Sequence, residues 1–226
     1  MELREAMRTT PATRTFRDEE VTDETLWQVL DAARFAPSGG NRQPWRVIVV
    51  KDPQARGAVR DHYVLGWREY LAHVAQSRVP FAPDEHGSWD GPAVDLDAAR
   101  AVERPDEFAD NLDVAPVVML VCADLPALAV TDNGLGRQSI VGGGSVYPFG
   151  HNILLAARDL GLGGVMTTVI CREEAALKEL FAIPERFAVA GLVVLGYPAR
   201  SVTRLRRRQV EEFTWLDRFD GEPFGA

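Results

Sequence analysis

The chain has 226 residues, 46% of them hydrophobic and 26% charged, and this length and composition indicate a single globular domain. The formal net charge of −8 argues against a general nucleic-acid binder, because such a surface repels phosphates. Cys122 and Cys171 lack the spacing of a metal or redox site, so both are read as reduced, buried thiols.

The first 51 residues predict two helices and a strand. The charged N-terminus lacks the apolar run of a signal peptide, so we expect a cytoplasmic protein with no membrane-spanning segment. A short helix is expected over 2–9, and a second begins after Thr22, a favourable N-cap residue, and ends at Pro37. Residues 45–51 predict a strand covered on both faces. The loop before this strand holds small and amide residues between two rigid elements, which is typical of a ligand-binding loop.

The rest of the chain alternates helices and strands. A long helix is expected over 53–79, followed over 80–95 by either a mobile flap or a plain surface loop, and residues 60–113 as a whole are a candidate lid or interface segment. Strands are expected over 116–123, 164–170 and 187–195, and helices over 146–160 and 172–181. This order predicts one domain with a mixed sheet and helices on both faces.

Few motifs point to chemistry carried by the protein itself. The glycine run 142–144 lacks the ending of a phosphate-binding loop, the four histidines have no metal-ligand spacing, and no serine has a visible base. Hydroxyl, amide and arginine side chains instead gather at element ends, where they suit a bound cofactor. These residues are Arg8, Thr10, Arg14, Ser38, Asn41, Gln43, Thr167, Thr168 and Arg207. The basic cluster over 204–208 reads either as a solvated surface, which we favour, or as a phosphate site.

Four stretches then carry a family resemblance. They are Arg14-Thr-Phe16 followed by Val21, Ala36-Pro-Ser-Gly-Gly-Asn-Arg-Gln-Pro-Trp45, Asn152-Ile-Leu-Leu-Ala-Ala157 leading to Gly161-Leu-Gly163, and Ile183-Pro184 through Leu195-Gly-Tyr-Pro198. With these stretches the chain resembles the FMN-dependent nitroreductase family, which includes iodotyrosine deiodinase and 5,6-dimethylbenzimidazole synthase branches. The second stretch is the most specific of the four.

The resemblance implies an α+β homodimer with a three-layer fold and FMN at the subunit interface. It assigns Arg14 and Arg207 to the FMN phosphate region, and Ser38 and Gly39 to the loop beside the flavin. Met166, Thr167 and Thr168 match the segment along the ring, where a donor to flavin N5 is found. Asn41 is a further candidate contact, whereas Gln43, Pro44 and Trp45 are expected to fix the loop against the strand.

The chain also departs from the family pattern. Many relatives read Arg-Arg-Ser-x-Arg where this sequence has Thr10-Pro-Ala-Thr-Arg14, so two phosphate contacts are missing, and Arg8 is the candidate substitute for one. Arg207 aligns loosely because Gln209 stands where relatives often have proline. Thr167 and Thr168 look like the deiodinase branch, but residues 63–89 lack its Glu, Tyr and Lys clamp, so deiodination is not predicted.

The expected function is a ping-pong oxidoreductase in which NADH or NADPH reduces FMN and a small nitroaromatic or quinone-like acceptor reoxidises it. Thr167 or Thr168 would tune the flavin, with no acid or base from the protein. Four aromatic residues either stack on substrate or pack in the core: Trp67, Tyr70, Phe81 and Trp89. Three alternatives stay open: specialised flavin chemistry of the benzimidazole-synthase or dehalogenase type, flavin binding without turnover, and a cofactor-free structural protein.

Overall fold

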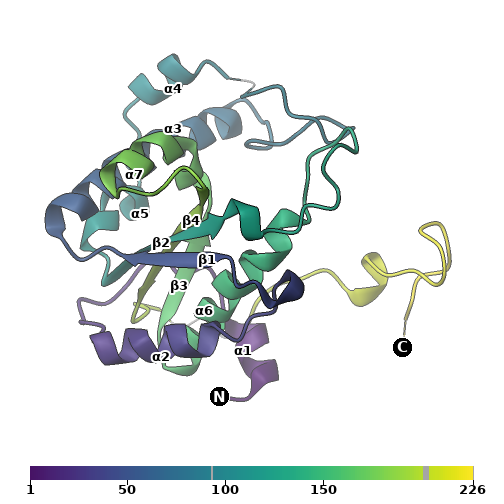
Figure 1. Ribbon diagram of the computed structural model, residues 1–226, viewed down its shortest axis with the longest axis horizontal. Coiled ribbons are helices and arrows are strands. Elements are labelled where there is room, and N and C mark those ends of the chain that lie inside the picture. The colour runs from purple at the N-terminus through teal and green to yellow at the C-terminus, as the bar shows by residue number, and fades with distance from the viewer. Residues whose placement is uncertain (93, 201–203, 226) are drawn as a thin grey trace.

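A four-stranded antiparallel sheet in the order β1-β2-β4-β3 forms the centre of the computed structural model, which describes residues 1–92, 94–200 and 204–225 (Figure 1). The strands are β1 (Trp45–Val49), β2 (Val117–Asp124), β3 (Gly163–Thr167) and β4 (Phe187–Gly196). All eight residues of β2 are buried, and Leu120 lies opposite Leu192 of β4 in the register of the sheet. The two inner strands therefore carry the core, and β1 and β3 are its edges.

Helices cover both faces of this sheet (Figure 1). The helices α2 (Asp23–Ala33) and α6 (Tyr147–Asp159) pack on one face, with α1 (Leu3–Thr9) beside α6. The other face is covered by α3 (Pro53–Ala75), α5 (Glu107–Asp110) and α7 (Glu174–Leu180), and α4 (Leu96–Ala101) packs against α3. Each face thus has its own apolar cluster, which confirms the α+β class with helices on both sides of a central sheet.

Local signals predicted most element boundaries to within a few residues. The hydroxyl of Thr22 accepts a hydrogen bond from the backbone N–H of Thr25 at 3.2 Å, which confirms the predicted N-cap of α2. The prediction for β3 was too long, because the chain turns after Thr167 into a 3₁₀ turn over Val169–Glu173. The helix expected over 172–181 consequently begins at Glu174. The long helix α3 ends at Ala75, and Ser77 just beyond it has a positive φ of 55°.

The edge position of β1 limits how far its side chains are buried. Val47 and Val49 pack against the cluster beneath α2 and α6, whereas Ile48 packs against the cluster beneath α3. Both faces of the strand are therefore covered, as predicted, yet all three residues keep partial exposure because no strand of the described chain pairs with its outer side. The four strands pair only antiparallel with one another. The parallel part of the expected mixed sheet is limited, in the described chain, to the isolated bridge between Ala12 and Gly164.

The C-terminal segment over 204–225 extends away from the folded body (Figure 1). It contains a 3₁₀ turn at Val210–Glu212 and a bridge between Trp215 and Pro223, and the side chain of Phe219 is 85% exposed. In the described part of the chain, no helix is both long enough and apolar enough to cross a lipid bilayer.

Candidate functional site

The outer edge of β3 is the backbone surface from which the site is built. The N–H of Thr13 donates to the carbonyl of Gly164 at 2.9 Å, so the main-chain groups of Gly164 point away from β4. Main-chain direction alternates along a strand, so the N–H and C=O of Met166 and the N–H of Thr168 point outward as well. Among the described residues, no strand pairs with this edge beyond Gly164. The edge can therefore bind the polar atoms of a ligand lying along it.

The side chain of Thr167 joins this edge to helix α3. The phenol oxygen of Tyr63 lies 3.4 Å from Oγ1 of Thr167, and the Tyr63 ring meets Phe108 of α5 edge-on with centroids 5.8 Å apart. The guanidinium carbon of Arg14 lies 5.9 Å from the centroid of the Phe108 ring. Three distant segments, the N-terminal arm and helices α3 and α5, therefore converge on the end of β3.

The pKa of Tyr63 reflects this cluster. Burial raises the pKa of its phenol above the ordinary value, and the hydrogen bond to Thr167 and the positive charge of Arg14 partly oppose that shift. The phenol is therefore protonated at neutral pH and can donate to Oγ1 of Thr167. When it does so, the proton of the Thr167 hydroxyl is left to donate elsewhere. The arrangement can present one oriented O–H group beside the strand edge.

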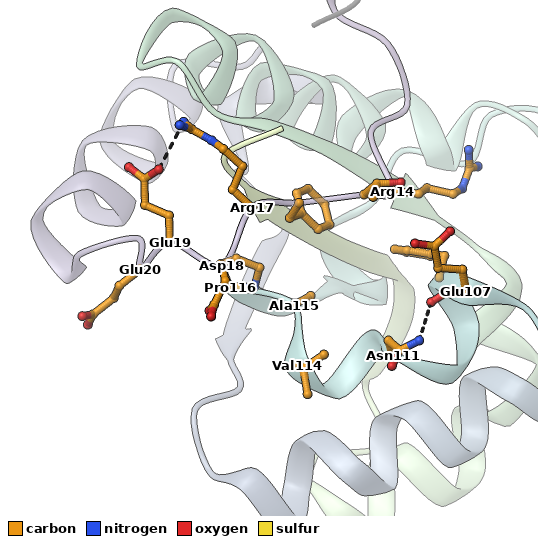
Figure 2. Close-up of a pocket in the computed structure, with 13 residues that line it drawn as sticks. Arg14, Arg17, Asp18, Glu19, Glu20, Glu107, Asn111, Val114, Ala115 and Pro116 are labelled. Carbon is orange, nitrogen blue, oxygen red and sulfur yellow. Dashed lines mark hydrogen bonds and ion pairs between the residues drawn. The ribbon is translucent and has the colours of Figure 1, made fainter. Parts of the chain in front are cut away.

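A cavity of about 810 Å³ opens next to Arg14 (Figure 2). In Figure 2, the side chains of Arg14 and Arg17 point in opposite directions, and Arg17 pairs with Glu19 at 3.2 Å. Arg14 is exposed and forms no hydrogen bond or ion pair with any described residue. Four carboxylates line the cavity against these two arginines: Asp18, Glu19, Glu20 and Glu107. Glu107 lies on the same side of the cavity as Arg14 in Figure 2 but forms no ion pair with it, so Arg14 is the lining arginine whose charge is left for an anion.

The predicted ligand loop is held rigid by its own polar groups. Ser38 Oγ accepts from the N–H of Gln43 at 3.0 Å, and the Gln43 side-chain amide donates to Asn41 Oδ1 at 3.2 Å. The N–H of Gly39 donates to Ser145 Oγ at 3.0 Å. Trp45 stacks on Phe149 with ring centroids 4.8 Å apart. Gln43 thus forms hydrogen bonds within the loop, and Trp45 packs against α6; that Gln43, Pro44 and Trp45 fix the loop against the strand stays a prediction.

The remaining predicted contacts do not gather around Arg14 within one chain. Arg8 is exposed at the end of α1, and Arg207 donates to the carbonyl of Arg206 in the extended C-terminal segment. Thr10 donates to the carbonyl of Ala6 at 2.7 Å and lines a cavity of about 10 Å³, too small for a phosphate. Of the four residues expected near a phosphate, Arg8, Thr10, Arg14 and Arg207, only Arg14 lines the cavity of about 810 Å³.

The family resemblance assigns Arg14, Met166, Thr167 and Thr168 to one flavin site, but Tyr63 and Phe108, which lie between Arg14 and Thr167 in the structure, were not predicted. Neither residue lies in one of the four stretches that carry the family resemblance. A local signal for Phe108 existed in Asp106, whose Oδ1 accepts from the N–H of Phe108 at 3.1 Å and starts a helix there. No hydrogen bond among the described residues joins the loop over 38–43 to this cluster.

Comparison with known proteins gives a consistent result. Residues 7–197 match the sequence model of the Nitroreductase family. A candidate NADH dehydrogenase/NAD(P)H nitroreductase of Archaeoglobus fulgidus is 32% identical over 187 residues, covering 82% of this chain and 79% of the relative. The 5,6-dimethylbenzimidazole synthase of Rhodospirillum rubrum is 28% identical, covering 82% of this chain and 76% of the relative. The crystal structure of a candidate nitroreductase of Desulfovibrio desulfuricans in complex with FMN has a TM-score of 0.62 and 24% identity, over 97% of this chain and 96% of that one.

Proposed function

Because the chain belongs to the nitroreductase family, we propose that it is an FMN-dependent oxidoreductase working as a homodimer. NADH or NADPH is the proposed electron donor, and the acceptor is a small electron-poor compound of the nitroaromatic or quinone type. The single observation that carries this proposal is the open outer edge of β3 at Met166 and Thr168, beside an arginine with no partner among the described residues.

The residues around this edge fit the parts of FMN. Arg14 would hold the phosphate, because its guanidinium is exposed and forms no ion pair with a carboxylate of the described chain. The N–H and C=O of Met166 and the N–H of Thr168 would contact the polar edge of the ring. Thr167 would donate its hydroxyl proton toward the ring, held in direction by the phenol of Tyr63 at 3.4 Å.

A second copy of the chain would complete the site. The resemblance places Ser38 and Gly39 beside the flavin, with Asn41 close by, yet within one chain no hydrogen bond joins their loop to Arg14 or Thr167 among the described residues. A two-fold dimer would bring the loop of one protomer to the β3 edge of its partner, because both surfaces appear twice in such an assembly. The rigid hydrogen bonding of the loop prepares it for such a contact.

When bound, FMN supplies the hydride and electron chemistry of the reaction. The protein then has three tasks: to bind the anionic end at Arg14, to orient the ring along β3, and to place the Thr167 hydroxyl where negative charge develops on the ring. None of the side chains that converge at the end of β3, those of Arg14, Tyr63, Phe108 and Thr167, is placed to act as a general base. The pKa of Tyr63 is raised by burial, so its phenol stays protonated and acts through Thr167.

The visible spectrum of the purified protein, before and after anaerobic addition of NADPH, tests this proposal. Flavin absorption that bleaches on addition is the expected result. A protein that is colourless and fails to take up added FMN would contradict the proposal. A yellow protein that NADH and NADPH both fail to bleach would instead favour flavin binding without turnover. Stoichiometric loss of FMN after aerobic reduction would favour the benzimidazole-synthase type of chemistry.

Arg14→Ala tests the assignment of the phosphate end. Loss of a charge-assisted contact is expected to weaken FMN binding by about 1–3 kcal/mol. Arg17→Ala is a matched control, because this arginine lines the same cavity but points away from Arg14 and pairs with Glu19 (Figure 2). Equilibrium dialysis with FMN measures both variants. Equal affinities for the two variants would contradict the role of Arg14.

A further inference from the structure

A second cavity, of about 400 Å³, lies at the C-terminal end of β3, and Arg172 is the arginine that lines it. Its lining residues come from the connection between α3 and α4, from the loop before α6, and from the 3₁₀ turn over Val169–Glu173 with the residue that precedes it. They are Phe81, Pro83, Trp89, Gln138, Thr168, Val169, Cys171 and Arg172. None of them is acidic. This volume lies at the small end of the range of about 300–1,000 Å³ for small-molecule sites, so it suits a single-ring compound rather than a dinucleotide.

Arg172 is fixed in this cavity by a buried carboxylate. Its Nε donates to Oε2 of Glu69 at 2.9 Å, and Glu69, in the middle of α3, is fully buried. The other carboxylate oxygen of Glu69 accepts from Arg100 at 2.7 Å. Arg100 also pairs with Glu173 at 2.5 Å, so the four charges of this cluster sum to zero. One nitrogen of the Arg172 guanidinium is therefore anchored, and its plane is held in a defined orientation.

The two terminal nitrogens of Arg172 are left available. Neither donates a hydrogen bond to a residue within 1–92, 94–200 or 204–225, and the side chain is 27% exposed. The guanidinium carbon lies 5.7 Å from the ring centroid of Phe81 and 5.7 Å from that of Trp89. The free N–H groups thus form a fork beside two aromatic rings, a geometry that matches the two oxygens of a carboxylate on a planar ring.

We propose that this cavity is a binding subsite for a planar aromatic compound that carries a carboxylate. The carboxylate binds the terminal nitrogens of Arg172, and the ring packs against Trp89 and Phe81. Thr168 lines the cavity and also ends the strand edge assigned above to the flavin. The subsite is therefore the acceptor side of the same centre, an identification that rests on the proposed function. The preferred acceptors of the enzyme are then anionic nitroaromatic or quinone-like compounds rather than neutral ones.

Equilibrium binding to the oxidised, purified protein tests the subsite without turnover. The probes are 4-nitrobenzoate and its neutral isostere 4-nitrobenzamide, each measured by isothermal titration calorimetry. Charge-assisted hydrogen bonds are expected to favour the benzoate by at least about tenfold. Arg172→Gln should abolish this preference and Arg172→Lys should retain part of it, because lysine keeps the charge but not the fork.

Arg34→Gln is the matched control. Arg34 also binds a carboxylate through Nε, to Asp31 at 2.7 Å, and also lies over an aromatic ring, that of Phe35 at 4.5 Å. It does not line this cavity. Arg34→Gln is therefore expected to leave the preference for the benzoate unchanged. An equal loss in the Arg34 and Arg172 variants would overturn the assignment, because it would show an effect of net charge only.

A second variant keeps the test decisive if Arg172→Gln does not fold. Trp89 is 36% exposed, so Trp89→Leu should fold, and it is expected to weaken both probes by a similar factor while keeping the preference for the benzoate. Equal affinity of the wild-type protein for the two probes would refute the subsite even if NADPH bleaches a bound flavin. Selective benzoate binding by a protein that takes up no flavin would refute the oxidoreductase proposal and leave the subsite standing.

Discussion

The phenol oxygen of Tyr63 lies 3.4 Å from Oγ1 of Thr167, although 104 positions separate the two residues in the sequence. This contact connects the middle of α3 to the last residue of β3. It gives the Thr167 hydroxyl a defined direction at the strand edge, where the flavin is proposed to lie. The contact makes Tyr63 a positioning residue, because it acts through Thr167.

Tyr63→Phe removes this contact and keeps the buried ring. The loss of one hydrogen bond, worth about 1 kcal/mol, is expected to slow flavin reduction about fivefold and to lower the flavin midpoint potential. Stopped-flow reduction by NADPH and a redox titration measure the two effects. Tyr70→Phe is the control, because Tyr70 stacks on Trp67 with centroids 4.7 Å apart and its phenol forms no hydrogen bond with a described residue. A shifted rate with an unchanged potential would count against positioning through Thr167.

Gly66 allows α3 to lie close to the 3₁₀ turn that follows β3. A Cβ atom at this position would be 2.8 Å from Cγ1 of Val169 and 2.9 Å from its carbonyl oxygen. The carbonyl belongs to the backbone and cannot move aside, so Gly66→Ala is expected to destabilise the fold by about 1–3 kcal/mol.

Gly57→Ala in the same helix serves as the control for this prediction. No atom lies within 4 Å of a Cβ built on Gly57, so the alanine should stabilise the helix by about 0.5–1 kcal/mol. Thermal unfolding should therefore show midpoint shifts of opposite sign for the two variants. A lowered midpoint in both variants would mean that crowding at Val169 is not the cause.

Asp132 holds the loop before α6 in shape and gives stability a dependence on pH. It accepts from the N–H of Ile140 at 2.8 Å, from Ser139 at 2.7 Å and from Arg137 at 2.9 Å. These bonds hold its pKa well below the ordinary value of 3.8. The unfolded chain therefore binds a proton at higher pH than the folded chain, so the stabilisation is complete above pH 3.8 and decreases as the pH falls toward the lower pKa of the folded state.

Asp132→Asn measures this effect. The wild-type protein should be more stable than the variant at neutral pH, and the difference should shrink when denaturant unfolding is repeated below pH 3.8. Asp90→Asn is the control, because Asp90 is exposed and forms no hydrogen bond with a described residue. A difference that stays constant with pH would show that the charge of Asp132 is not its source.

The two cysteines are expected to be unreactive in the folded protein. Burial raises the pKa of Cys122 to about 11 and that of Cys171 to about 12, and the structure contains both as free thiols. Below these values the neutral thiol predominates, and it is a poor nucleophile. Alkylation by iodoacetamide at pH 8 should be negligible until guanidinium chloride unfolds the chain. Cys171 lines the cavity of about 400 Å³ beside Arg172, so rapid labelling of this thiol by iodoacetamide would show that its pKa is not raised.

The amino-acid sequence by itself determined the elements and the family. The N-cap at Thr22 and the apolar runs of β2 and β4 are local signals, and local hydrogen bonding and burial act on them directly. The expected stop at Pro37 was less accurate, because α2 already ends at Ala33. The stretch from Ala36 to Trp45 identified the family because its loop geometry demands particular residues. Three residues of this loop, Gly40, Asn41 and Gln43, have positive φ angles.

Only the tertiary structure decided which edges and side chains meet. The order β1-β2-β4-β3 leaves the outer edge of β3 beyond Gly164 without a partner strand among the described residues, and no local propensity encodes strand order. The contacts of Thr167 with Tyr63 and of Arg172 with Glu69 depend on how closely α3 packs over the end of β3. Likewise, only the packed chain showed that the loop at Ser38 and the guanidinium of Arg14 form separate clusters within one protomer. The physical reason is that the Thr167–Tyr63 and Arg172–Glu69 contacts join residues that are distant in the sequence. The packing of the whole core determines whether such residues meet.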